Sequence, residues 1–310
     1  MATRLSPDPC WAVGRAGFGH PIYDPVRGPL EQLALDDHWP DAARLNALGA
    51  TIGRTPQTAS GHPIRFVPPP PDAENYELRV HASGEVATRP DDWHDLFNAL
   101  AWFAFPQTKA TLNAIHAREI PGEADRRGPT RDLLTIFDEG GAVVACADPD
   151  LIDLIRAFRW KALFWTERAR VAASMRVVVF GHAVLEKALS PWPGIICKVL
   201  LVPVSRALLT APVTQLVDAL DDTAAAWFNA HARTSSPRDL APFPVFGYPG
   251  WSEDSARAEF YADTRYFRPR PLTAQDGGGR IVTGVGQAVA ACPVSERAEE
   301  SPGSAERDAG

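Results

Sequence analysis

Apolar positions run almost without interruption through residues 96–105, which read LFNALAWFAF. Asn98 is the polar exception, so the pattern predicts a helix that is buried on nearly all sides. Thr88 and Asp91 stand before it at about the spacing of a capping box. Pro106 has no amide hydrogen to donate and therefore ends or kinks the helix. The run is much shorter than the roughly 20 apolar residues that span a bilayer, so it predicts a core helix and no membrane span.

Two glycine-containing turns predict β-hairpins. The first turn is residues 82–85, ASGE, between two β-rich runs, and Gly84 supplies its positive φ angle. The second turn is residues 138–141, DEGG, which joins expected strands at residues 133–137 and 142–146.

Helical patterns cover residues 107–118, 147–158 and 211–232. Residues 194–204 read as a strand, whereas residues 176–180, RVVVF, fit a buried strand or a helix. Hairpins and helices thus follow one another without a regular βαβ alternation, which indicates an α+β fold.

The chain divides into three regions by composition. Residues 1–72 are rich in proline and glycine and are expected to pack on the core, with two short helices separated by Pro40. Residues 73–271 form the expected core domain, which ends in an irregular, aromatic segment wrapped around it. Residues 272–310 are rich in small and charged residues and are expected to be a disordered tail.

Composition excludes several classes of protein. The 310 residues are 45% hydrophobic and 22% charged, as in soluble globular proteins, and the net charge is −7. A negative balance argues against binding nucleic acid or a membrane surface, because phosphates need a basic face. The four cysteines show no CxxC-like spacing, and the N-terminus lacks the apolar stretch (about 7–15 residues) of a secretory signal. A cytoplasmic protein with free thiols is therefore predicted.

Polar side chains gather at the entrance of the buried helix. His94 and Asn98 lie four residues apart and so share one face, and Asp95 lies about 100° round the helix from His94. An unpaired buried amide costs roughly 1–3 kcal/mol, so Asn98 must find partners. The cluster is either part of a functional site or a structural network that fixes the helix to the first hairpin, with Arg89 as one partner.

Two other segments carry polar side chains at helical spacing. Lys109, Asn113 and His116 share one face of the next helix, which is either part of a site or a solvated edge. His182 and Glu186 stand at i and i+4, which lets both side chains bind one metal ion or lets the carboxylate orient the imidazole.

These residues support three hypotheses. The first is a metal-assisted or His/carboxylate acid–base hydrolase, and its site would draw on His94, Asp95, His116, His182, Glu186 and Asp138. In the metal version His94, His182 and Glu186 would bind a divalent ion such as zinc, manganese or iron. The second is a non-catalytic ligand-binding or protein-interaction protein that uses the aromatic segment before residue 271. In the third, the buried polar residues only specify the fold. Serine-hydrolase and nucleotide-binding motifs are absent from the sequence.

Several longer segments resemble a single bacterial family, the domain-of-unknown-function family numbered 3025. They are WHDLFNALAWFAFPQTKATLNAIHA, RDLLTIFDEGG, FGHAVLEK, FPVFGYPGW and FYADTRYFRP. The resemblance extends from Tyr76 to Pro271. It implies that these polar segments belong to one domain. The family is uncharacterised, so it implies no activity, cofactor or catalytic residue.

Overall fold

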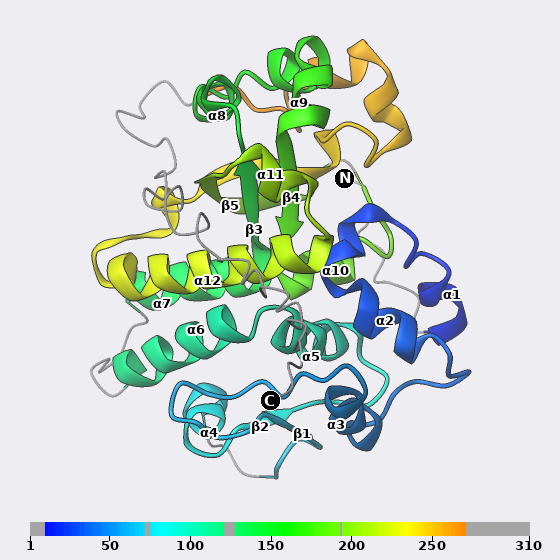
Figure 1. Ribbon diagram of the computed structural model, residues 1–310, viewed down its shortest axis with the longest axis vertical. Coiled ribbons are helices and arrows are strands. Elements are labelled where there is room, and N and C mark those ends of the chain that lie inside the picture. Colours follow the sequence, from blue (N-terminus) through cyan, green and yellow to red (C-terminus); the bar gives the residue numbers. More distant parts are fainter. Residues whose placement is uncertain (1–9, 72–74, 121–127, 193, 271–310) are drawn as a thin grey trace, which may run out of the picture.

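A four-stranded sheet forms the centre of the fold (Figure 1). The computed structural model describes residues 10–71, 75–120, 128–192 and 194–270. Strands β3 (Gly141–Cys146) and β5 (Ile196–Pro203) pair in parallel, and β4 (Met175–Val179) and β6 (Ala241–Pro244) flank them in antiparallel pairing. Every residue of β3 is buried, as expected of a strand covered on both faces.

Helices stack on one another beyond the sheet. Helix α7 (Pro129–Gly140) packs on β3 and β5, and α6 (Pro106–Glu119) packs on α7 and on α12 (Val213–His231). Helix α5 (Trp93–Ala104) packs on α6 and on α10 (His182–Lys187). Figure 1 shows these helices grouped below the sheet. The stack brings polar faces of α5, α6, α7 and α10 together.

The helices α8 (Pro149–Arg156) and α9 (Arg168–Ser174) contact other parts of the sheet, at β3, β6 and β4. The remaining described elements are α1 (Trp11–Arg15), η1 (Pro21–Val26), α2 (Arg27–Leu33), α3 (Ala42–Thr51), β1 (Arg65–Val67), α4 (Tyr76–Ser83), β2 (Glu85–Ala87), η3 (Ala162–Thr166), α11 (Arg206–Thr210), η4 (Ala232–Thr234), η5 (Pro237–Asp239), η6 (Val245–Gly247), η7 (Glu253–Ala256) and η8 (Ala258–Ala262).

The first predicted hairpin is wrong. The segment before Gly84 is helix α4, whose N-cap Asn75 accepts hydrogen bonds from the amides of Glu77 and Leu78. Gly84 has the expected positive φ of 74°, but it closes the helix C-terminus. The strand after it, β2, pairs in parallel with β1. A left-handed glycine serves a helix C-cap as well as a hairpin turn, so the local sequence could not separate them.

The second predicted hairpin is half wrong. Residues 142–146 are in β3 as expected, but residues 133–137 belong to α7, and Asp138 lies in that helix and not in a turn. Leu133, Leu134 and Phe137 are fully buried on one helix face, while Ile136 is exposed. That is a helical period, and the strand interpretation overlooked it.

The other predicted elements are confirmed, with small changes at their ends. The predicted helix at 107–118 is α6, the one at 211–232 is α12, and the ambiguous segment 176–180 is β4. Asp148 caps α8, where its side chain accepts a hydrogen bond from the Asp150 amide. Helix α5 is capped by Asp92, which accepts a hydrogen bond from the Asp95 amide, and not by Thr88 or Asp91. The α+β class is confirmed.

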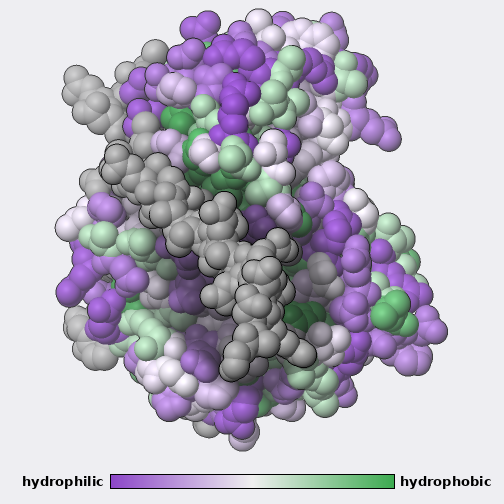
Figure 2. All heavy atoms as spheres, viewed as in Figure 1, coloured by the Kyte–Doolittle hydropathy of each residue, from purple (hydrophilic) through white to green (hydrophobic). Residues whose placement is uncertain are grey.

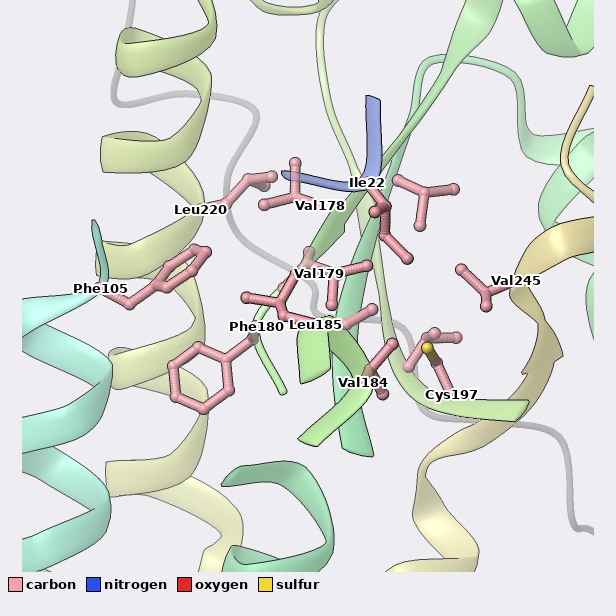
Figure 3. Packing of buried hydrophobic residues seen from close by; sticks show 14 of the residues in the cluster. Ile22, Phe105, Val178, Val179, Phe180, Val184, Leu185, Cys197, Leu220 and Val245 are labelled. Atoms are coloured by element: carbon pink, nitrogen blue, oxygen red, sulfur yellow. The ribbon is translucent and has the colours of Figure 1, made fainter. Parts of the chain in front are cut away.

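The N-terminal segment shares the core with the sheet. Ile22 is fully buried and lies beside Val178 and Val179 of β4 (Figure 3). Phe105, at the end of α5, packs edge-on against Phe180, with ring centroids 5.1 Å apart. On the face shown in Figure 2, hydrophilic side chains predominate among the coloured residues. The described residues form a single domain with one continuous hydrophobic core.

Domain boundaries at residues 72 and 271 remain predictions, and the expected tail, 272–310, lies outside the described residues. No helix among the described residues is long and apolar enough to cross a membrane.

The aromatic segment before residue 271 is part of the core. It consists of β6 followed by short 3₁₀ turns. Five of its aromatic rings are 3–8% exposed: Tyr248, Trp251, Tyr261, Tyr266 and Phe267. The apolar area of these five rings is therefore buried in the core, so they do not form an exposed surface for a ligand or partner.

Candidate functional site

His182 is held at the sharp turn where β4 leaves the sheet. The amides of Phe180 and Gly181 both donate to the carbonyl of Gly141, at 3.1 and 2.8 Å. Helix α10 then begins at His182 itself, and its packing on α5 brings two segments about 90 residues apart into contact. The side chain that α5 presents there is His94.

The two imidazoles are in direct contact. His94 Nε2 lies 3.0 Å from His182 Nε2, and the ring planes are 78° apart. The other nitrogen of His94, Nδ1, lies 3.2 Å from Oε2 of Glu186. His94 is about one-third exposed (35% of its side chain), whereas His182 is only 4% exposed. The pair therefore connects a solvent-facing imidazole to a buried one.

A partly buried carboxylate, Asp138, lies beyond His182. Nδ1 of His182 has no hydrogen-bond partner among the described residues, and Oδ2 of Asp138 is 3.7 Å away from it. That distance is too long for a direct hydrogen bond. The two groups interact electrostatically at this distance.

Lys109 continues the network on the far side of Asp138. Its Nζ donates to Asp138 Oδ1 at 2.7 Å and to Asn98 Oδ1 at 2.8 Å, and Asn98 Nδ2 donates to the hydroxyl of Tyr76 at 3.0 Å. Seven side chains from five helices thus form one continuous series, called the polar chain below: Glu186, His94, His182, Asp138, Lys109, Asn98 and Tyr76.

The two imidazoles have opposite acid–base tendencies. The hydrogen bond to Glu186 raises the pKa of His94 above its ordinary value, although partial burial opposes this. Burial lowers the pKa of His182 to about 4. At neutral pH a proton taken up by the pair therefore resides on His94.

Proton positions follow from the neighbours of each ring nitrogen. When His94 is protonated, Nδ1–H faces Glu186, and Nε2–H donates to Nε2 of His182, whose own proton sits on Nδ1 facing Asp138. Removing one proton leaves two arrangements. In one arrangement Nδ1 of His94 is unprotonated and its lone pair faces Glu186. In the other, Nδ1 of His182 is unprotonated and its lone pair faces Asp138. The two carboxylates thus favour keeping the proton on the pair.

The charge on Asp138 is stabilised by its neighbours. Burial by itself raises the pKa of this carboxyl group, but the Lys109 ammonium and His182 outweigh burial and hold the pKa below its ordinary value. Asp138 is therefore a carboxylate at neutral pH, ion-paired with a lysine that is only 5% exposed.

Two candidate residues lie beside the polar chain and not within it. Asp95 accepts hydrogen bonds from the backbone amide of Arg89 at 2.7 Å and from its guanidinium at 2.8 Å, which is the structural pairing that the sequence suggested. Although burial alone raises the pKa of Asp95, these bonds lower it. His116 accepts from Arg131 at 3.4 Å, and it lies within electrostatic reach of Asp138.

The three candidate metal ligands are neighbours that do not converge. Glu186 lies on the Nδ1 edge of His94, whereas His182 lies on the opposite, Nε2 edge. Across the described part of the chain, no group of three or more His, Cys, Asp or Glu side chains could hold a metal ion. The imidazole pair instead has a carboxylate at each end, Glu186 beside His94 and Asp138 beside His182.

Sequence reasoning missed two members of the site. Tyr76 falls in the run expected to be the first strand of a hairpin, and the face of Lys109 is open between part of a site and a solvated edge. The available signal was Asn98, because a buried amide requires partners on neighbouring elements and both missed residues are its partners.

Fold and site together define an α+β protein with a partly buried, charged polar chain where helices meet the end of a strand. The chain belongs to the family described as protein of unknown function, DUF3025, which it matches over residues 64–271. That range contains every residue of the polar chain. No curated protein and no solved structure matches the sequence.

Replacing Gly181 with alanine is expected to displace His182 and destabilise the fold by about 1–3 kcal/mol. A Cβ atom at residue 181 would lie 2.5 Å from the carbonyl oxygen of Glu139 and 2.6 Å from the amide nitrogen of Gly141, both backbone atoms. Gly140→Ala is the matched control, because a Cβ there meets no atom within 4 Å. Urea unfolding of both variants tests this, and equal stabilities would contradict the expected role of Gly181.

The pairing of Glu186 with His94 is expected to stabilise the fold most at mildly acidic pH. A histidine whose pKa is raised on folding contributes stability below its unfolded pKa of about 6.5, and the contribution is lost as pH rises through the folded pKa. Glu186→Gln should therefore cost up to about 1 kcal/mol near pH 6 and less near pH 9. Unfolding titrations at both pH values measure the difference. A cost that grows with pH would contradict the pairing.

Proposed function

We propose that the protein is a hydrolase that uses His182 and His94 for acid–base catalysis. One observation supports this most strongly. The 3.0 Å contact between the two Nε2 atoms links a solvent-facing imidazole, backed by Glu186, to a buried imidazole whose Nδ1 has no partner. A structural network would be expected to satisfy that atom, whereas a catalytic base needs it free for the substrate.

In the base form, His94 is neutral and keeps its proton on Nδ1 toward Glu186. His182 then donates Nε2–H to His94 and presents a lone pair at Nδ1. A water molecule that bonds to this nitrogen gives up a proton to it, while the Nε2 proton of His182 passes to His94. The water oxygen adds to the electrophilic atom of the substrate, and the positive charge comes to rest on His94 beside Glu186.

The acid form completes the reaction. The protons move back in the opposite order, from His94 to His182 Nε2 and from His182 Nδ1 to the leaving group. Asp138 faces His182 Nδ1, where it stabilises the proton in transit, and Lys109 keeps Asp138 ionised. Each histidine returns to its starting state, so no other proton acceptor is required.

The rate is expected to depend on the ionisation of His94. Because the base form requires neutral His94, kcat/KM should rise with pH through its raised pKa. Glu186→Gln removes the hydrogen bond that raises this pKa, so it should shift the rising limb to lower pH.

A panel of chromogenic esters, amides and phosphate esters, assayed with the full chain from pH 5 to 9, tests the proposal. We expect hydrolysis of one class, a rising pH limb that Glu186→Gln displaces to lower pH, and no effect of a chelator. Metal found by elemental analysis, with activity lost on chelation, would instead support the metal-assisted form. Absence of hydrolysis of every probe would count against the enzyme and favour a binding protein.

A cytoplasmic location is part of the proposal and agrees with the free state of the described cysteines.

A further inference from the structure

Three buried polar atoms without hydrogen-bond partners belong to side chains in or next to the polar chain. They are Trp102 Nε1, Asn113 Oδ1 and His182 Nδ1, in side chains that are 2%, 3% and 4% exposed. Only five such side-chain atoms occur among the described residues, and each costs roughly 1–3 kcal/mol when no partner is present. Three of the five belong to His182, to Trp102 beside Lys109 and to Asn113 one helical turn from Lys109, which points to a polar partner for this part of the fold.

Two of these atoms lie along the contact between α5 and α6. The Trp102 ring centroid is 5.4 Å from Lys109 Nζ, and Trp102 lies one turn beyond Asn98, which also bonds to Lys109. Asn113 lies one turn beyond Lys109 on α6, or about 6 Å along the helix axis. Both helices thus direct polar side chains toward a common region.

The orientation of the Asn113 amide is fixed by its partner. Its Nδ2 donates to the backbone carbonyl of Glu77 at 2.9 Å and to Oε2 of that residue at 2.7 Å. A carbonyl oxygen only accepts, so the nitrogen must face Glu77 and the oxygen is the atom left without a partner. Asn113 therefore offers an acceptor to a ligand.

Lys109 and Trp102 offer donors. The ammonium has three N–H groups, and two of them have acceptors among the described residues, Asn98 and Asp138. The indole N–H of Trp102 adds another donor. Since Asp138 already neutralises the charge of Lys109, a neutral carbonyl oxygen suits these donors better than an anion does.

We infer that the contact between α5 and α6 is an amide-binding subsite, so that the substrate is a peptide-like or N-acyl amide. The inference rests on the proposed function. The carbonyl oxygen of the substrate accepts from Lys109 and Trp102, and an N–H about one helical turn away donates to Asn113. In the reaction a C–O bond forms to the water oxygen, the C–N bond breaks, and the amine leaves with the proton from His182. Solvent reaches both ends of the polar chain, at His94 and at Tyr76, whose exposure is 37%.

Binding of N-acetylglycinamide, measured by saturation-transfer NMR on the full chain, tests the subsite without requiring hydrolysis. Methyl acetoxyacetate, which has carbonyl groups but no N–H, is the matched probe. We expect the amide to bind at least fivefold more tightly than the ester. Trp102→Phe and Asn113→Leu should each weaken amide binding at least fivefold, whereas Asn113→Asp, which keeps an acceptor oxygen, should retain it.

Trp160→Phe is the control for Trp102→Phe, because Trp160 is also buried, at 4% exposed, but its Nε1 donates to the Arg268 carbonyl at 2.9 Å. The control should lose stability and keep amide binding. Amide binding that is equal in wild type and Trp102→Phe, or absent from wild type, would overturn the subsite. Binding without hydrolysis of any probe would retain the subsite and reject the proposed function.

Discussion

Replacing His182 with alanine is expected to lower kcat/KM for the hydrolysed substrate by about 10²- to 10⁴-fold. The variant removes the nitrogen that takes the proton from water and also breaks the path to His94, which lies 3.0 Å away. Steady-state kinetics on the full chain measure the loss. His231→Ala is the matched control, because His231 is only partly buried, and its Nδ1 bonds to the Trp227 carbonyl of its own helix, outside the polar chain.

A structural role for His182 would give a different result. The variant leaves a space beside Asp138 that imidazole in solution can occupy, so added imidazole should restore part of the lost rate. Circular dichroism and urea unfolding show whether the variant is folded. A folded His182→Ala protein with wild-type kcat/KM would contradict catalysis at this residue.

Replacing Lys109 with methionine is expected to destabilise the protein by about 3–5 kcal/mol at pH 7. The change removes the cation that lies 2.7 Å from Asp138 and leaves the carboxylate inside the protein without its ion-pair partner. The double variant Lys109→Met/Asp138→Leu removes both charges and should recover most of the stability. Urea unfolding of the wild type, both single variants and the double variant completes the cycle.

The stability loss caused by Lys109→Met is expected to depend on pH. In the wild type the pKa of Asp138 is lowered, so the ion pair stabilises the fold at neutral pH, and this stabilisation is lost as pH falls through that pKa. Without Lys109, burial should raise the pKa of Asp138. The deficit of Lys109→Met should therefore shrink as pH is lowered and Asp138 becomes protonated. Stability within 1 kcal/mol of wild type at pH 7 would contradict a role for this pair.

Helix faces could be predicted from the sequence, whereas the contacts between helices could not. The spacing of Lys109, Asn113 and His116 placed them correctly on one face of α6. The solvated edge, one of the two interpretations open for this face, is wrong: all three side chains are at most 5% exposed, and Asp138 in α7 presents a carboxylate to Lys109. Spacing within a helix gives no information about which faces meet across the fold.

The His182–Glu186 pair also shows that spacing within a helix does not identify which side chains bond to each other. Their i, i+4 spacing suggested that the carboxylate orients the imidazole of its own helix. Glu186 instead bonds to His94, 92 residues earlier in the chain. The choice between the two imidazoles depends on the packing of α5 against α10, which is a long-range contact. The sequence therefore identified the histidines and the carboxylate that take part, but not which histidine bonds to the carboxylate.

Nitrogen NMR titration of the imidazoles of His94 and His182 tests the central claim most directly. If the pair carries one proton and conducts it, His94 should take up that proton with an apparent pKa above 6.5, and His182 should stay neutral until the pH approaches about 4. Glu186→Gln should lower the apparent pKa of His94. Independent protonation of both rings near pH 6.5, with no response to Glu186→Gln, would contradict the shared proton and the acid–base mechanism based on it.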